Sequence, residues 1–202
     1  AFGLSAGSRM TVTLTPEITM PHARKDTLVW QPGAYYHIYN RGVQKAPLFH
    51  EKTNYLYVLR KAKHYSKALQ LSIIAYCLMP NHYHFLVHQK GEYAAGLLVQ
   101  RIFNGYTKAY NKRYGHSGTL FERRYQAKLV DNEAHLLHLC RYIHANPVKD
   151  GFVEHPENWP YSNYLEWLGK RNGALIDAAF IRKNFESPEA YQVFVHAYLQ
   201  LK

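Results

Sequence analysis

Two histidines one residue apart are the first feature of this sequence that could do chemistry. His82 and His84 follow Met79-Pro80-Asn81, a turn sequence, and flank Tyr83 in a run of β-forming residues. Because side chains alternate across a strand, both imidazoles should lie on one face. Two neutral imidazoles side by side suit a divalent metal ion. The chain has 13 histidines in 202 residues, so such a pair also arises by chance and does not establish a metal site alone.

A tyrosine and an asparagine one helical turn apart form the second such feature. Apolar residues recur with a helical period between Leu136 and Ile143, and Pro147 disfavours helical geometry in the residue before it, so we expect a helix ending near Asn146. Tyr142 and Asn146 then share one face, which puts a nucleophile beside a metal-binding amide. Taken singly, such a tyrosine is more typical of a core ring and such an asparagine of a helix cap. The combination with the histidine pair indicates a reaction centre.

The two motifs, in this order and spacing, resemble those of the single-tyrosine HUH transposases. The branch they resemble is that of the REP-associated tyrosine transposases. The resemblance runs from about residue 36 to residue 164, about two thirds of the chain, and is carried by residues 36–42, 48–49, 79–87, 141–151 and 159–164. One position departs from the family pattern: His144 stands where relatives often carry an acidic residue, which puts any supporting role of that position in doubt.

The resemblance implies a metal-dependent enzyme that cleaves and rejoins single-stranded DNA. His82, His84 and Asn146 would hold Mg²⁺ or Mn²⁺ and leave other positions for water and a phosphate oxygen. Tyr142 would attack the phosphorus. Since a phenol has a pKa of about 10, the cation and nearby Arg141 would be needed to favour its ionised form. The family analogy gives a 5′-phosphotyrosine intermediate with a free 3′-hydroxyl, so no nucleotide cofactor is required.

The implied substrate is an imperfect palindrome that folds as a hairpin in single-stranded DNA. The charge agrees, because 25 Lys and Arg against 14 Asp and Glu give +11, as expected for a protein with a polyanionic partner. The branch also implies a monomer rather than a dimer that exchanges tyrosines. Basic side chains of this kind are more often a solvated face, but here we expect DNA contacts from Arg41, Arg123, Arg124, Lys128 and Arg141.

Two other interpretations stay open at this stage. The chain could be a non-catalytic or domesticated hairpin-binding protein that uses the same sheet, in which case binding would need no metal and would survive Tyr142→Phe. It could also be a cupin-like metal enzyme, which shares the His-x-His strand. That class, however, expects many more strands and a glutamate about four residues after the pair, where this chain has His88.

The elements that must position these residues follow from periodicity and turn signals. We expect strands over 35–40, 69–79, 82–88 and 121–130, with the apolar strand 69–79 central in the sheet. Helices are expected from Thr53 or Asn54 to about 65, over 92–114, and after a cap at Asp131-Asn132. This order predicts an α+β fold, a ferredoxin-like or RRM-like βαββαβ antiparallel sheet with helices on one face and an extra helix that carries Tyr142.

The chain divides into three expected regions. Residues 1–32 are interpreted as an N-terminal tag remnant and extension, and 33–151 as the HUH transposase domain. Residues 152–202 are expected to form a C-terminal helical extension packed on that domain rather than a separate DNA-reading surface. No apolar run is long enough to span a membrane, and Cys77 and Cys140 lack CxxC spacing, so we expect no membrane partner, buried free thiols and a cytoplasmic location.

Overall fold

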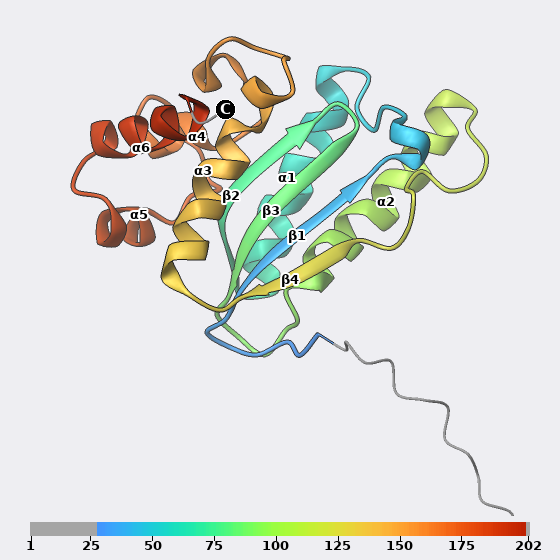
Figure 1. The fold of residues 1–202 in the computed structure, drawn as a ribbon. Helices are drawn as coiled ribbons and strands as arrows, with labels where there is room; N and C mark the ends of the chain where they lie inside the picture. The colour runs from blue at the N-terminus through green and yellow to red at the C-terminus, as the bar shows by residue number, and fades with distance from the viewer. Residues whose placement is uncertain (1–27, 201–202) are drawn as a thin grey trace, which may run out of the picture.

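A four-stranded antiparallel sheet forms the centre of the molecule (Figure 1). The computed structural model describes residues 28–200, so the expected tag remnant lies outside the described residues. The strands are β1 (Tyr35–Arg41), β2 (Leu71–Met79), β3 (His82–Gln89) and β4 (Gln126–Val130), paired in the order β2-β3-β1-β4. With α1 (Lys52–Ala68) after β1 and α2 (Gly96–Tyr114) after β3, this is the predicted βαββαβ, ferredoxin-like α+β fold.

The two faces of the sheet are covered differently. Helices α1 and α2 lie behind the sheet in Figure 1, and their apolar stripes pack on inward-facing strand residues such as Tyr36, Ile38 and Phe85. Helix α3 (Glu133–Lys149) lies on the opposite face, mainly along β2, so β1 and β4 stay more open there. Within residues 28–200, no helix combines the length and the apolar character that crossing a membrane requires.

Two predicted boundaries were wrong, namely the start of the first helix and the start of the last strand. Helix α1 begins at Lys52, and Asn54 lies inside its first turn, where its Oδ1 accepts the backbone N–H groups of His50 and Glu51. The predicted strand 121–130 forms ladder pairs only from Gln126 onward. Residues 121–125 are therefore a loop.

The tyrosine helix continues beyond the predicted stop. Helix α3 begins after Asn132, whose side chain accepts the N–H of His135 as predicted for a cap. It runs to Lys149 with Pro147 inside it. Pro147 has no N–H to donate to the preceding turn, but its carbonyl accepts the N–H of Phe152 at 2.9 Å, which closes the end of the helix. The expected end near Asn146 was thus one turn too early.

Strand β2 lies at an edge of the sheet, not at its centre as its apolar sequence suggested. The free edge is covered by the segment around 159–163. Leu78 donates its N–H to the carbonyl of Tyr161 at 2.9 Å, and the indole of Trp159 donates to the carbonyl of Leu78 at 3.1 Å. The C-terminal segment shields this edge and α3 covers one face, so β2 is buried almost throughout. Its sequence is therefore as apolar as that of a central strand.

The C-terminal helices α4 (Tyr164–Trp167), α5 (Ala178–Asn184) and α6 (Pro188–Gln200) pack beside α3 (Figure 1). His144, on α3, is fully buried between them. Its Nε2 donates to Asn163 Oδ1 at 2.8 Å, and its Nδ1 accepts the hydroxyl of Tyr191. This histidine therefore ties α3 to α6 and to the segment that covers β2. We propose that residues 152–200 fold as part of the same domain as 33–151.

The burial of His144 predicts a loss of stability in acid. Burial lowers the pKa of His144 to about 4, against an ordinary value near 6.5. The folded state keeps His144 neutral down to about pH 4, whereas the unfolded state binds a proton there from about pH 6.5 downward. The free energy of unfolding should therefore fall by roughly 3 kcal/mol as the pH drops from about 6.5 toward 4. Urea unfolding between pH 8 and 4 should show a shallower acid decline for His144→Gln than for the wild type, while exposed His64→Gln keeps the wild-type slope. Equal slopes in both variants would contradict this.

Candidate active site

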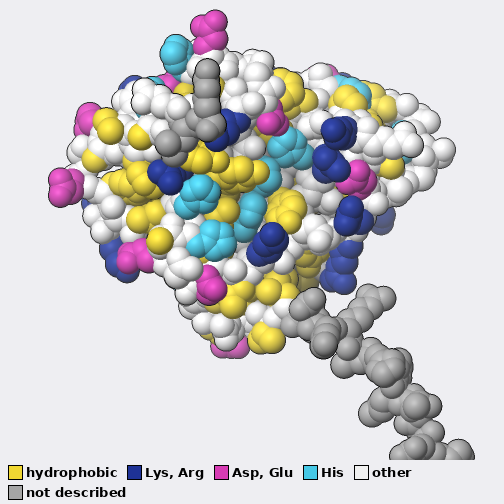
Figure 2. All heavy atoms as spheres, in the orientation of Figure 1, with side chains coloured by type: hydrophobic (Ala, Val, Ile, Leu, Met, Phe, Trp, Pro, Cys, Tyr) yellow, Lys and Arg dark blue, Asp and Glu magenta, His cyan; other side chains and the backbone are white. Residues whose placement is uncertain are grey.

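The histidine pair lies on the partly open face of the sheet. Strand β3 places His82 and His84 on the same side, and their ring centroids are 5.1 Å apart. In the antiparallel register His84 lies opposite Tyr39 and His82 opposite Arg41 of β1. Figure 2 shows histidine side chains gathered near the middle of this face, with Lys and Arg side chains around them. Two central strands thus form a rigid support for the pair.

Each imidazole of the pair forms a hydrogen bond through its Nδ1. His82 Nδ1 lies 2.7 Å from the Oδ1 of Asn81, which can only accept, so His82 donates there and Nε2 keeps its lone pair. His84 Nδ1 lies 3.0 Å from Nε2 of His37, a histidine of β1. When His84 donates in that bond, its own Nε2 is also left as an acceptor. Both rings can then offer the same nitrogen to a metal ion.

Burial keeps these imidazoles neutral. It lowers the pKa of His37 to about 4, and nearby Lys128 adds to the effect. Burial also lowers the pKa of His82, and it holds the pKa of His84 well below the ordinary value. At neutral pH the rings therefore carry no proton that a cation must displace.

Helix α3 brings Tyr142 and Asn146 to the histidines. The Tyr142 ring stands edge-on to His84, with centroids 5.6 Å apart and planes at 80°, and its centroid lies 6.3 Å from that of His37. Asn146 is buried and donates its Nδ2 to the backbone carbonyl of Tyr142 at 2.9 Å, which leaves its Oδ1 available as a ligand. The two motifs that are far apart in the sequence thus meet on one face.

Two residues at this site were missed by the sequence reasoning. His37 alternates with Tyr39 on the first strand, but only the cross-strand register shows that it reaches His84. Asp150 follows Asn146 by one more turn of α3, and its Oδ2 lies 3.9 Å from Nε2 of His82. The i, i+4 spacing was the available signal for Asp150, and it was hidden by the assumption that Pro147 ends the helix.

The phenol of Tyr142 is not activated by the protein alone. Burial raises its pKa above 10, and the side chain of Asn146 acts in the opposite direction. Arg141 does not lie beside the phenol. Its guanidinium packs over the rings of Phe194 and Tyr198 of α6, at 4.5 and 5.1 Å from their centroids. The expected help from Arg141 in ionising Tyr142 therefore has no contact to support it.

The other four expected DNA contacts lie around the histidines or beside them. Lys128 lies opposite His37 on the same face of the sheet and is exposed. Arg41 is ion-paired with Glu122 at 3.0 Å. Arg123 and Arg124 are exposed in the loop before β4. Arg41 and Arg123 share a groove of about 350 Å³, whose other lining residues are Tyr39, Asn40, His82, Glu122 and Gln126.

The donor set fits a hard divalent cation. Within residues 28–200, no three His, Cys, Asp or Glu side chains are grouped so that they could hold a metal ion. The expected site of His82, His84 and Asn146 differs from such a group because its third ligand is an amide oxygen. Nitrogen ligands from neutral imidazoles and an amide oxygen suit Mn²⁺, and oxygen ligands from water and phosphate would satisfy Mg²⁺.

Comparisons with known proteins decide the family. The model of the family described as "Transposase IS200 like" matches residues 31–146, more than half of the chain. The chain belongs to this family. A Haemophilus influenzae protein assigned as a REP-associated tyrosine transposase is 32% identical to this transposase in an alignment 124 residues long. The alignment covers 55% of this chain and 70% of the relative.

A solved structure supports the fold of this IS200-like transposase. It is described as a REP-associated tyrosine transposase bound to a REP hairpin and superposes with a TM-score of 0.62 at 18% identity. The match covers 77% of this chain and 94% of that chain. The βαββαβ sheet and its helices are therefore those of the family.

Proposed function

We propose that this transposase acts on single-stranded DNA hairpins of the REP type, and that it cleaves and rejoins one strand through a 5′-phosphotyrosine at Tyr142. The observation that carries the proposal is the Tyr142 ring, which stands edge-on to the imidazoles of His84 and His37, with the Asn146 amide one turn away on the same helix. The hairpin substrate is supported by the descriptions of two relatives, a REP-associated tyrosine transposase and a hairpin-bound structure.

The reaction is a transesterification that conserves the phosphodiester bond. The Tyr142 oxygen gives its proton to a water molecule and attacks the phosphorus, and the bond from phosphorus to the 3′-oxygen breaks. That oxygen takes a proton back from water, so the net result is transfer of the phenol proton to the 3′-hydroxyl. In the reverse step a 3′-hydroxyl attacks the phosphotyrosine and releases Tyr142. No bond energy is spent, so no nucleotide cofactor is needed.

Each side chain of the site has a role in this scheme. His82, His84 and Asn146 would hold Mg²⁺ or Mn²⁺, which when bound neutralises charge on the non-bridging oxygens and lowers the pKa of the phenol. Arg41 and Lys128 lie on the same face and would contact the phosphates on either side.

The arrangement supports a monomer that acts in cis. Tyr142 reaches the histidines of its own chain, so one chain carries every proposed catalytic group. Cys77 and Cys140 are free and buried, which suits a reducing compartment and supports the cytoplasm as the location.

The test is a cleavage assay with labelled single-stranded hairpin DNA from the flanks of the chain's own gene. Incubation with Mg²⁺ or Mn²⁺ should give a band that carries the protein covalently on the 5′ end of the DNA on a denaturing gel, and chelator should remove it. Tight hairpin binding without a covalent product under any of these metals would favour the non-catalytic alternative.

His37 should set the metal affinity through its hydrogen bond to His84. His37→Ala is expected to weaken Mn²⁺ binding about 10- to 100-fold, because the orientation and hydrogen-bonding state of the His84 ring are then no longer fixed. Titration calorimetry without DNA measures this directly. The matched control is His88→Ala, since His88 lies further along β3 and stacks on Tyr35 instead. An equal loss in both variants would show that His37 has no specific role.

A further inference from the structure

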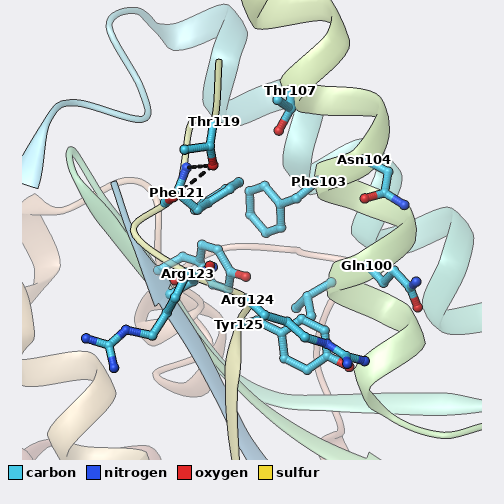
Figure 3. Close-up of a pocket in the computed structure, with 12 residues that line it drawn as sticks. Gln100, Phe103, Asn104, Thr107, Thr119, Phe121, Arg123, Arg124 and Tyr125 are labelled. Atoms are coloured by element: carbon cyan, nitrogen blue, oxygen red, sulfur yellow. Dashed lines mark hydrogen bonds between the residues drawn. The ribbon is translucent and has the colours of Figure 1, made fainter. Parts of the chain in front are cut away.

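A second hollow lies on the other side of β1 from α3, between α2 and the loop 119–125 (Figure 3). Its volume is about 320 Å³, at the small end of the range for ligand pockets. It shares Asn40 and Arg123 with the groove that reaches His82. A strand lying in that groove would therefore pass the mouth of this pocket.

Aromatic rings form the floor of the pocket. Tyr83 and Phe103 stack in parallel, with centroids 4.2 Å apart and planes at 10°. Phe121 stands edge-on to Phe103 at 5.3 Å and 81°, and it is only partly buried. The partly exposed Phe121 ring offers the kind of face on which an unpaired base stacks.

Polar side chains without protein partners form the rim. Gln100 and Asn104 are exposed on consecutive turns of α2, and Thr107 follows them. Figure 3 shows these residues on α2 across from Thr119 and Phe121. Within residues 28–200 the two amides make no hydrogen bond to the protein in the structure. Each amide carries donors and an acceptor, the combination that pairs with the edge of a base.

The pocket wall is held in place before any ligand binds. Glu122 donates its N–H to the carbonyl of Arg41 at 3.1 Å, and Val43 donates to the carbonyl of Leu120 at 3.2 Å. The Asn40 side chain donates to the carbonyl of Arg123 at 3.0 Å. Loop 119–125 is thereby fixed to the end of β1, and a ligand would meet a preformed surface.

The charge around the pocket matches a polyanion. Arg123 and Arg124 line it and are exposed, and in the described part of the chain neither forms an ion pair. The Arg123 side chain extends away from the rings in Figure 3, and it also lines the groove that leads to His82. An aromatic floor with amides above and guanidinium groups outside is the arrangement expected around a base whose phosphate lies outside the pocket.

We propose that this pocket binds one unpaired nucleobase of the DNA strand whose scissile phosphate lies near His82. The inference rests on the proposed function for the placement of the strand, and it adds a sequence-reading subsite to that function. Because the pocket is small, it takes a single base and reads it at a fixed distance from the cut.

The test uses stem-loop DNA with a single-stranded extension from the gene's own flank, in a series that carries one abasic position at a time. Fluorescence anisotropy in chelator should show one position where loss of the base weakens wild-type binding roughly tenfold or more. The double variant Gln100→Ala/Asn104→Ala should bind intact DNA correspondingly more weakly and should no longer respond to that position. Phe121→Leu should give the same loss, and Gln31→Ala, at the opposite end of β1, should behave as wild type.

The outcomes separate this inference from the proposed function. An abasic profile in the pocket variants identical to that of the wild type, with the covalent product still formed, would overturn the pocket and leave the transposase chemistry standing. Loss of the abasic response in the variants supports the pocket, even if no covalent product forms with any metal. Wild-type binding that responds to no abasic position would also overturn the inference.

Discussion

Tyr142→Phe should abolish the covalent DNA product and leave hairpin binding within about twofold of the wild type. The substitution removes only the attacking oxygen, so cleavage should fall by more than about a thousandfold. The hydroxyl interacts with the side chain of Asn146, and its loss should leave the edge-on contact between the ring and His84 in place. Denaturing gels measure cleavage, and anisotropy in chelator measures binding.

Tyr39→Phe is the matched control for this variant. Tyr39 lies on the same face, with its ring centroid 5.8 Å from that of His84, so it would be the nearest replacement if the nucleophile were wrongly assigned. Tyr39→Phe should keep the covalent product. Cleavage that persists in Tyr142→Phe and disappears in Tyr39→Phe would show that Tyr39 of β1 is the nucleophile.

Asn163→Ala should cost about 3–5 kcal/mol of unfolding free energy, the largest stability effect expected in the chain. Its Oδ1 accepts the N–H of Tyr76 and Nε2 of His144, both at 2.8 Å. Its Nδ2 donates to the carbonyls of Ile74 at 2.9 Å and Leu175 at 3.2 Å. Removal leaves four buried groups without this partner, each at a cost.

Urea unfolding at pH 7 measures the effect of Asn163→Ala. Asn158→Ala, an exposed neighbour in the same segment, should stay within about 0.5 kcal/mol of the wild type. A single cooperative transition, shifted as a whole, is the expected result for a C-terminal region that folds with the sheet. Loss of α4–α6 in a separate early transition would contradict the single domain.

Local patterns carried most of the successful predictions. Alternation placed His82 and His84 on one face, and the i, i+4 rule put Tyr142 beside Asn146, because both relations depend only on backbone geometry within one element. The contact between His37 and His84 depends on which strands pair and in which register, and spacing along the chain does not contain that information.

Two predictions were wrong, the central position of β2 in the sheet and the end of α3 near Asn146, because each sequence pattern has more than one possible structural cause. An apolar strand indicates burial on all sides, and for β2 that burial is supplied by Trp159 and Asn163 of a distant segment instead of by a second strand. Pro147 predicts a helix end because a proline disfavours helical geometry in the residue before it, yet α3 continues through Pro147 to Lys149. Asp150 was missed for that reason.

The segment around 159–163, which covers the free edge of β2, should affect the solubility of a shortened protein. Strand edges with free N–H and carbonyl groups recruit other chains and promote aggregation. A version that ends at Gly151, just after the tyrosine helix, would keep every proposed catalytic group yet leave the nine-residue strand β2, apolar except for Ser72, along an unprotected edge. We therefore expect residues 152–200 to protect the protein from aggregation by covering this edge, although they supply none of the proposed catalytic groups.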